Sequence, residues 1–255
     1  MADYMHFVFG WLGAVVVGVP FAIWYLVMER QRFQVEVWVK PTPVLALALF
    51  LLIAYLAGVA QQTTYTILVV IALLLSAIAD SVFVCADWSA QRKVVPISRV
   101  TSAIGVLLFF LVQVLWIMLF TFSPALSGGV DPTSESAPLR IWILIGLAVF
   151  ASFGLGLMMW LHKAPQELEL LFVSVYVIAS IVSVWRAGAR VGYDSLHQRL
   201  DSQIIALVGI CLFATSDACI YLQYYVVKSP ASRFIVMLLY WAAQALLTLS
   251  SFLFV

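Results

Sequence analysis

The sequence predicts an all-α fold, an integral membrane bundle of about eight transmembrane helices. Of the 255 residues, 65% are hydrophobic and 10% are charged, whereas an ordinary soluble domain has roughly 25% charged residues. The mean hydropathy is +1.10, more apolar character than a water-soluble fold can bury. Apolar runs of about 20 residues, the length that crosses roughly 30 Å of hydrocarbon, recur along the chain.

These runs divide a single transmembrane domain, residues 1–255, into eight predicted spans. The first follows Asp3 rather than a basic stretch and is too long for a signal-peptide core, so we expect it to stay in the mature protein. The longest polar segment, 123–140, is rich in Pro, Gly and Ser, which is typical of a loop. The predicted spans are 6–28, 41–59, 65–86, 99–122, 139–160, 168–187, 203–226 and 233–254.

Lysine and arginine are distributed unevenly between the two ends of the predicted bundle. Short cytoplasmic loops carry an excess of both residues, so the richer end is expected to be cytoplasmic and both termini non-cytoplasmic. The richer end holds Arg30, Arg32, Lys40, Arg92, Lys93, Arg99, Lys163, Lys228 and Arg233, and the other end holds Arg140, Arg186, Arg190 and Arg199.

Two aspartates fall inside apolar runs. Asp80 ends TYTILVVIALLLSAIAD in the third span, and Asp217 lies within IIALVGICLFATSDACIYL in the seventh. A carboxylate at the centre of a membrane helix costs about 2.5–3.5 kcal/mol on insertion scales, so each is a candidate functional residue. At 1.5 Å per residue they lie about 22 and 21 Å from the starts of spans that run in the same direction, which predicts a similar depth. The alternative is that each carboxyl only bonds a neighbouring helix.

Other polar residues are expected near the same depth. In the eighth span, Tyr240 and Gln244 are one turn apart and share a face. Lys40 opens the second span from the same side, although a lysine there also serves as an interfacial anchor. Gln113 lies inside the fourth span and is equally explained by an interhelical hydrogen bond.

The two aspartate segments resemble one another. LLLSAIADSVFV and CLFATSDACIYL each pass from apolar through small residues to Asp, and a Q-x-L pattern follows in the next span, at Gln113 and at Gln244. This pattern suggests a 4+4 internal repeat with paired sites at the interface of its halves.

Several function classes find no support in the sequence. It has no GxSxG, HExxH, Walker or dinucleotide-binding motif. The three histidines are scattered, so we expect neither a metal site nor a cofactor. The three cysteines lie in or beside apolar spans, where they pack as small apolar groups. The residues leave open an acid–base enzyme, a proton-linked transporter of lipids or small molecules, and a receptor.

The polar landmarks resemble, in kind and order, those of the lysoplasmalogenase (YhhN-like) family. The most specific feature is Ser216-Asp217 in the seventh span followed by Tyr240 and Gln244 in the eighth. The matching segments are KPTPVLALALF, LLLSAIADSVFV, SAIGVLLFFLVQVLWIMLF, ALVGICLFATSDACIYL and VMLLYWAAQALLTLS.

The chain departs from the family pattern at two places. It has Ala79-Asp80 where the family usually has Gly-Asp, a mild change because alanine is nearly as small. It has Gln113 and Trp116 where the family usually has His and, three residues later, Tyr. Since glutamine does not titrate, a proton-transfer role for that His is not expected here.

The resemblance implies hydrolysis of the vinyl ether bond of a lysoplasmalogen to a fatty aldehyde and a glycerophospho-base. Glycosidases meet a similar chemical task with two carboxyl groups of different protonation, so Asp80 and Asp217 are expected to divide the catalytic roles. The expected substrate-binding residues are Lys40, Gln113, Ser216, Tyr240 and Gln244.

The expected partners are a lysophospholipid with an alkenyl chain and the surrounding membrane lipids. A net charge of +1 gives no indication of nucleic acid binding. The expected location is the endoplasmic reticulum if the protein is eukaryotic, or the inner membrane if it is bacterial.

Overall fold

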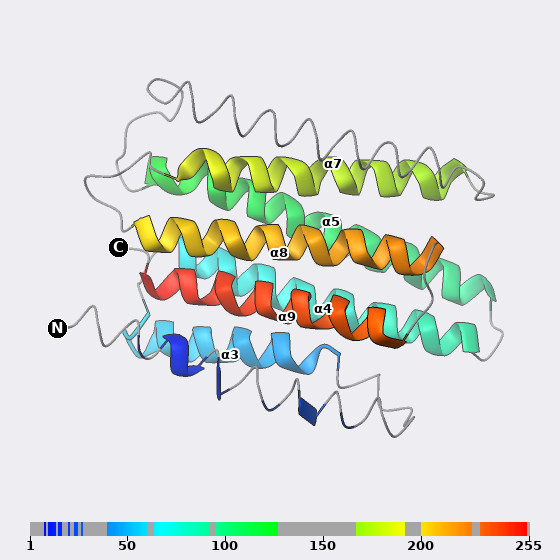
Figure 1. Cartoon of the computed structure of the whole chain (residues 1–255), viewed down its shortest axis with the longest axis horizontal. Coiled ribbons are helices and arrows are strands. Elements are labelled where there is room, and N and C mark those ends of the chain that lie inside the picture. Colours follow the sequence, from blue (N-terminus) through cyan, green and yellow to red (C-terminus); the bar gives the residue numbers. More distant parts are fainter. Residues whose placement is uncertain are drawn as a thin grey trace.

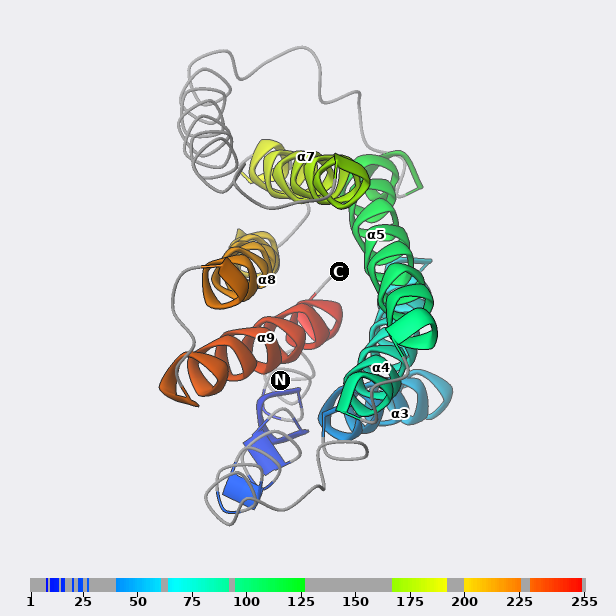
Figure 2. The ribbon, with the colours of Figure 1, turned by 90° about the vertical axis from the view of Figure 1, so that its right-hand side faces the viewer.

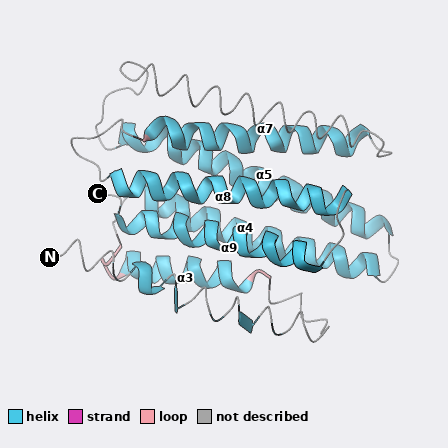
Figure 3. Cartoon of the chain, in the orientation of Figure 1, coloured by secondary structure: helices cyan, strands magenta, loops and turns pink. Residues whose placement is uncertain are grey.

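The computed structural model describes residues 40–60, 64–91, 95–126, 167–191, 200–225 and 230–253, with isolated positions between 8 and 27. Within these ranges every regular element is a helix (Figure 3). The helices lie side by side along one axis, as in a membrane bundle (Figure 1). They are α3 (Thr42–Leu56), α4 (Thr64–Gln91), α5 (Val95–Leu126), α7 (Glu167–Arg190), α8 (Leu200–Tyr225) and α9 (Pro230–Leu253).

The predicted all-α membrane fold is confirmed in its main features. Four segments in the described part of the chain are long and apolar enough to cross a bilayer: Thr64–Ala86, Val100–Thr121, Asp201–Ile220 and Phe234–Leu253. The protein is therefore an integral membrane protein. The predicted spans 41–59 and 168–187 correspond to α3 and α7, which are not among these four segments. The predicted spans 6–28 and 139–160 lie outside the described residues, apart from isolated positions in the first, so the count of eight stays a prediction.

The helices form a closed ring. Along the chain α3 packs on α4, α4 on α5, α5 on α7, α7 on α8 and α8 on α9, and α9 then returns to contact both α3 and α4. Figure 2 shows this ring from one end. In α3–α5 and again in α7–α9, each helix packs on the next one in the sequence, a relation that a 4+4 repeat would produce. The repeat itself stays a prediction.

α3 has one face toward the bundle and one toward lipid. Leu45, Leu49, Ile53 and Leu56 follow one another at helical spacing and are exposed. The opposite face buries smaller and branched side chains, among them Val44, Leu47, Ala48 and Leu51. An exposed aliphatic stripe on a membrane helix contacts lipid, because hydrocarbon is as apolar as leucine itself.

The length of α3 determines where Lys40 lies. The helix has proline in its first turn, where the missing N–H costs nothing, and ends before Gly58, whose φ of 69° suits glycine. Its 15 residues rise about 22 Å, too little to cross the membrane. The start of α3 is recessed relative to the end of α4 and the start of α5 (Figure 1), and Lys40, just before it, lies beside the buried Asp80.

A buried polar cluster ties the helices together at the opposite end. The Tyr65 hydroxyl and the Ser250 hydroxyl are 2.7 Å apart, and the Ser202 hydroxyl donates to the Ser250 carbonyl at 3.0 Å. The guanidinium of Arg190 lies 5.3 Å from the centre of the Tyr65 ring, a cation–π distance. This cluster links α4, α7, α8 and α9 far from the two aspartates.

We expect Gly209→Leu to destabilise the protein, because Gly209 lets α8 approach α9. A Cβ at this position would lie 2.9 Å from the Leu247 side chain and 3.3 Å from the Ala243 carbonyl oxygen. Overpacking of this kind costs about 1–3 kcal/mol. The measurement is the thermal unfolding midpoint in detergent, followed by tryptophan fluorescence. Val208→Leu, on the exposed face of the same helix, is the control, and equal midpoints for the two variants would contradict the expectation.

Candidate functional site

Asp80 and Asp217 are both inside the ring. Their exposed fractions are 1% and 9%. They reach the interior from α4 and α8, helices that do not follow one another around the ring. Tyr240, which donates to Asp80, also meets the ring of Phe213, one turn before Asp217 on α8. That both aspartates belong to one site stays a prediction.

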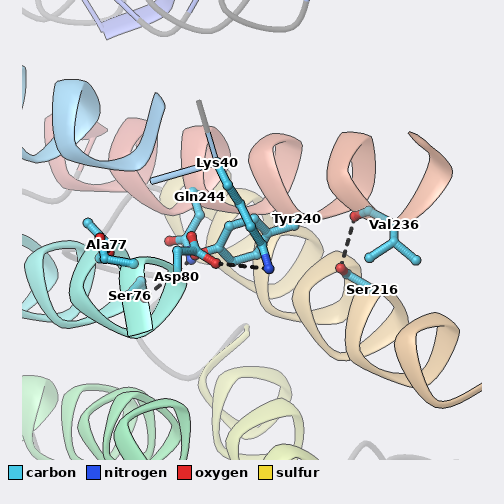
Figure 4. A network of polar contacts seen from close by, with 9 residues as sticks. Lys40, Ser76, Ala77, Asp80, Ser216, Val236, Tyr240 and Gln244 are labelled. Carbon is cyan, nitrogen blue, oxygen red and sulfur yellow. Dashed lines mark hydrogen bonds and ion pairs between the residues drawn. The ribbon is translucent and has the colours of Figure 1, made fainter. Parts of the chain in front are cut away.

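Asp80 has two partners from other helices. The Tyr240 hydroxyl donates to its Oδ2 at 2.8 Å, and the Nζ of Lys40 lies 3.8 Å from its Oδ1. The ammonium also lies 5.6 Å from the centre of the Phe83 ring. Figure 4 shows Lys40 extending from the start of α3 toward Asp80, with Tyr240 approaching from α9. Both oxygens of Asp80 are therefore occupied, one by a cation and one by a phenol.

The contact between Gln244 and Ser76 lies one helical turn from the contact between Tyr240 and Asp80. The Gln244 Nε2 donates to the Ser76 hydroxyl over a long 3.5 Å, and Ser76 precedes Asp80 by one turn on α4. The Gln244 Oε1 is buried and has no hydrogen-bond partner among the described residues. Because a buried amide oxygen without a partner costs about 1–3 kcal/mol, this atom is ready to accept a donor from a ligand or a water.

Asp217 has a different set of partners. The Tyr176 hydroxyl of α7 donates to its Oδ2 at 2.6 Å, and the Gln113 Nε2 of α5 approaches the same oxygen at 3.4 Å. Ser183, two turns after Tyr176 on the same face of α7, donates to the Gln113 Oε1 at 2.8 Å. Tyr176, Gln113 and Ser183 are all neutral and buried.

Three aromatic rings pack together next to the Asp80 contacts. Phe109 and Phe213 lie one turn before Gln113 and Asp217 on their helices, and both meet the Tyr240 ring edge-on, at 6.1 and 5.7 Å. The Phe109 and Phe213 rings are 6.3 Å apart. Edge-to-face packing at these separations is favourable, so an apolar, packed cluster adjoins the Asp80 contacts through Tyr240.

Ser216 faces α9 rather than the Asp80 contacts. Its hydroxyl donates to the Val236 carbonyl of α9 at 3.0 Å, and Figure 4 places this bond away from Asp80 and Lys40. The residue is next to Asp217 in sequence but about 100° further around the helix. Its visible role is to join α8 to α9, and its predicted contact with substrate stays a prediction.

Sequence reasoning missed Tyr176 and Ser183. The segment VSVYVIASIVSVW places Tyr176, Ser180 and Ser183 at spacings of four and three, which is one face of a helix. That spacing was the available signal. Spacing alone does not show whether this face points to the ring interior or to another helix, so no site role was predicted for these residues.

Across the ranges that the structure describes, no group of three or more His, Cys, Asp and Glu side chains is placed to hold a metal ion.

Comparison with known proteins identifies the family. The model of the YhhN family matches residues 35–251, a range that includes every candidate residue from Lys40 to Gln244. The chain belongs to the YhhN family. This family includes lysoplasmalogenases, and membership in it is consistent with a membrane hydrolase. Comparison with curated proteins and with solved structures found no match, so the YhhN assignment rests on the family model.

Proposed function

We propose that this YhhN protein hydrolyses the vinyl ether bond of lysoplasmalogens within the membrane. The observation that carries the proposal is a pair of buried carboxyl groups inside a helical ring, each hydrogen-bonded to a phenol. Burying two ionisable groups in a membrane bundle is costly, so such groups mark functional sites. The family supports the same chemistry, because it includes lysoplasmalogenases.

The reaction requires one proton donor and one group that tolerates a cation. A carboxylic acid delivers its proton to the carbon β to the ether oxygen, and the π electrons of the double bond form the new C–H bond. The resulting oxocarbenium ion is captured by water, which loses a proton and gives a hemiacetal. Cleavage of the hemiacetal C–O bond then releases a fatty aldehyde and a glycerophospho-base. The second carboxylate stabilises the cation and orients the water, as in glycosidases.

The substrate class follows from the groups around Asp80. Lys40 is 28% exposed at its side chain and would bind the substrate phosphate. In a lysoplasmalogen a single glycerol unit separates the phosphate from the vinyl ether, so a phosphate at Lys40 places the ether close to Asp80. Tyr240 and Gln244 would orient the carboxyl group or the ether oxygen, and the exposed aliphatic faces of the bundle contact membrane lipids.

The proposal needs no cofactor, because acid, carboxylate and water complete the reaction. It is compatible with the endoplasmic reticulum in a eukaryote and with the inner membrane in a bacterium.

The test is direct. Purified protein in nanodiscs is incubated with an alkenyl lysophospholipid, and fatty aldehyde is measured by mass spectrometry, with the acyl analogue as control. We expect aldehyde from the alkenyl substrate alone. Absence of aldehyde together with flux driven by a pH gradient in proteoliposomes would favour the alternative, a proton-linked lipid or small-molecule transporter that uses the same aspartates.

A further inference from the structure

The two carboxyl groups have chemically different surroundings. A cation and a phenol occupy the two oxygens of Asp80, one each. At Asp217 both donors, Tyr176 and Gln113, converge on Oδ2. Among the described residues no donor reaches Oδ1 of Asp217, whereas Oδ2 accepts two hydrogen bonds.

Ser183 holds the oxygen end of the Gln113 amide, whose other end faces Asp217. A glutamine amide presents an acceptor oxygen at one end and two N–H donors at the other. The Ser183 hydroxyl lies 2.8 Å from the Gln113 Oε1 and 2.8 Å from the Ser180 carbonyl oxygen, and its single proton serves one of them at a time. The Gln113 amide turns its NH2 toward Asp217 and Tyr176, where both oxygens accept. The Gln113 Nε2 then also donates to the Tyr176 hydroxyl oxygen, at 3.4 Å, which leaves the Tyr176 proton to Asp217.

Gln113 and Tyr176 thus both donate to the same oxygen of Asp217, Oδ2. An oxygen that accepts two donors is a poor place for the carboxyl proton, since an O–H there would oppose both N–H and O–H groups. A protonated Asp217 in this geometry carries its proton on Oδ1. Asp80 differs, because Lys40 supplies a positive charge beside its Oδ1 and the carboxylate form pairs with that charge.

We infer that Asp217 is the general acid of the proposed reaction and delivers its proton from Oδ1, that Tyr176, Gln113 and Ser183 are positioning residues for it, and that Asp80 acts as the carboxylate. The inference rests on the proposed function. In the first step the Oδ1–H bond breaks as the C–H bond forms at the carbon β to the ether oxygen. Asp217 becomes a carboxylate that accepts a proton from the attacking water, so it is regenerated in each turnover.

The first arm of the experiment separates the roles of the aspartates by pH dependence. With Asp217→Asn the remaining proton donor is the solvent, so the residual rate should fall about tenfold for each unit rise in pH. With Asp80→Asn the acid is retained, and the rate should keep a plateau at low pH. The same behaviour with the residues exchanged, a plateau for Asp217→Asn and a continuous fall for Asp80→Asn, would overturn the assignment.

The second arm tests the positioning residues. Tyr176→Phe and Ser183→Ala should each lower kcat by about tenfold or more with little change in KM, while Ser183→Thr, which keeps the hydroxyl, should restore most of the rate. Tyr65→Phe is the matched control, because it also removes a buried phenol hydrogen bond but at the far end of the ring. Equal rates for Tyr176→Phe and Tyr65→Phe would overturn the positioning role.

Different results would overturn the proposed function and the assignment of Asp217 as the general acid. No aldehyde from the wild-type protein overturns the proposed function and the assignment with it. Aldehyde from the wild type, combined with exchanged pH profiles or an unaffected Tyr176→Phe variant, overturns the assignment alone.

Discussion

Asp217→Asn should lower aldehyde release from an alkenyl lysophospholipid by about a thousandfold. General acid–base groups contribute roughly 10²–10⁴-fold to a rate, and an amide of nearly the same shape cannot supply the proton. Asp80→Asn should have a smaller effect, about a hundredfold, because it removes charge stabilisation while leaving the donor in place. The measurement is the initial rate of aldehyde formation by mass spectrometry with purified protein at one pH.

The control for this pair is Asp201→Asn. Asp201 is exposed in the first turn of α8, at the end of the bundle opposite Lys40, and its replacement should leave the rate unchanged. Thermal unfolding midpoints verify that each variant is folded. Full activity of both folded Asp80→Asn and Asp217→Asn would rule out the carboxyl-pair mechanism.

Lys40→Met should raise KM for a phosphorylated substrate by about ten- to a hundredfold, since a hydrogen bond to a charged group contributes roughly 1.5–3 kcal/mol. Methionine keeps the length and the apolar stem of the side chain and removes the charge. Lys40→Arg should recover much of the affinity because it retains the charge. The measurement is KM for an alkenyl lysophospholipid by aldehyde release, with proteins of verified folding.

A second substrate separates phosphate binding from the ion pair with Asp80. An alkenylglycerol lacks the phosphate but keeps the vinyl ether, so Lys40→Met should leave its KM close to that of the wild type. An equal rise in KM for both substrates would show that Lys40 acts through Asp80 rather than on the phosphate.

The part of the site that the sequence predicted well lies on α4 and α9. Asp80 stands out because a carboxyl inside an apolar run is rare, and Tyr240 and Gln244 because they share a helical face. Their antiparallel helices bring Tyr240 to Asp80 and Gln244 to Ser76, the depth that counting residues along each span had predicted.

Lys40 shows where counting along the chain falls short. Its place at the start of an apolar run suggested an anchor or a ligand at the membrane surface. Lys40, just before the short α3, instead reaches the buried Asp80 (Figure 4). The depth of a helix that is too short to span depends on its neighbours rather than on its own residues.

The sequence by itself determined that this protein is helical, lies in a membrane and carries two carboxyl groups within its apolar helices. These are local properties, since the cost of exposing a peptide group or a charge to hydrocarbon is set by each segment alone. Only the tertiary structure decided that Tyr176 faces Asp217, that Ser183 faces Gln113, that Ser216 joins two helices, and which oxygen of each carboxyl is occupied. Those facts depend on how each helix is rotated about its axis and which helix it faces across the ring, and packing between distant segments fixes both.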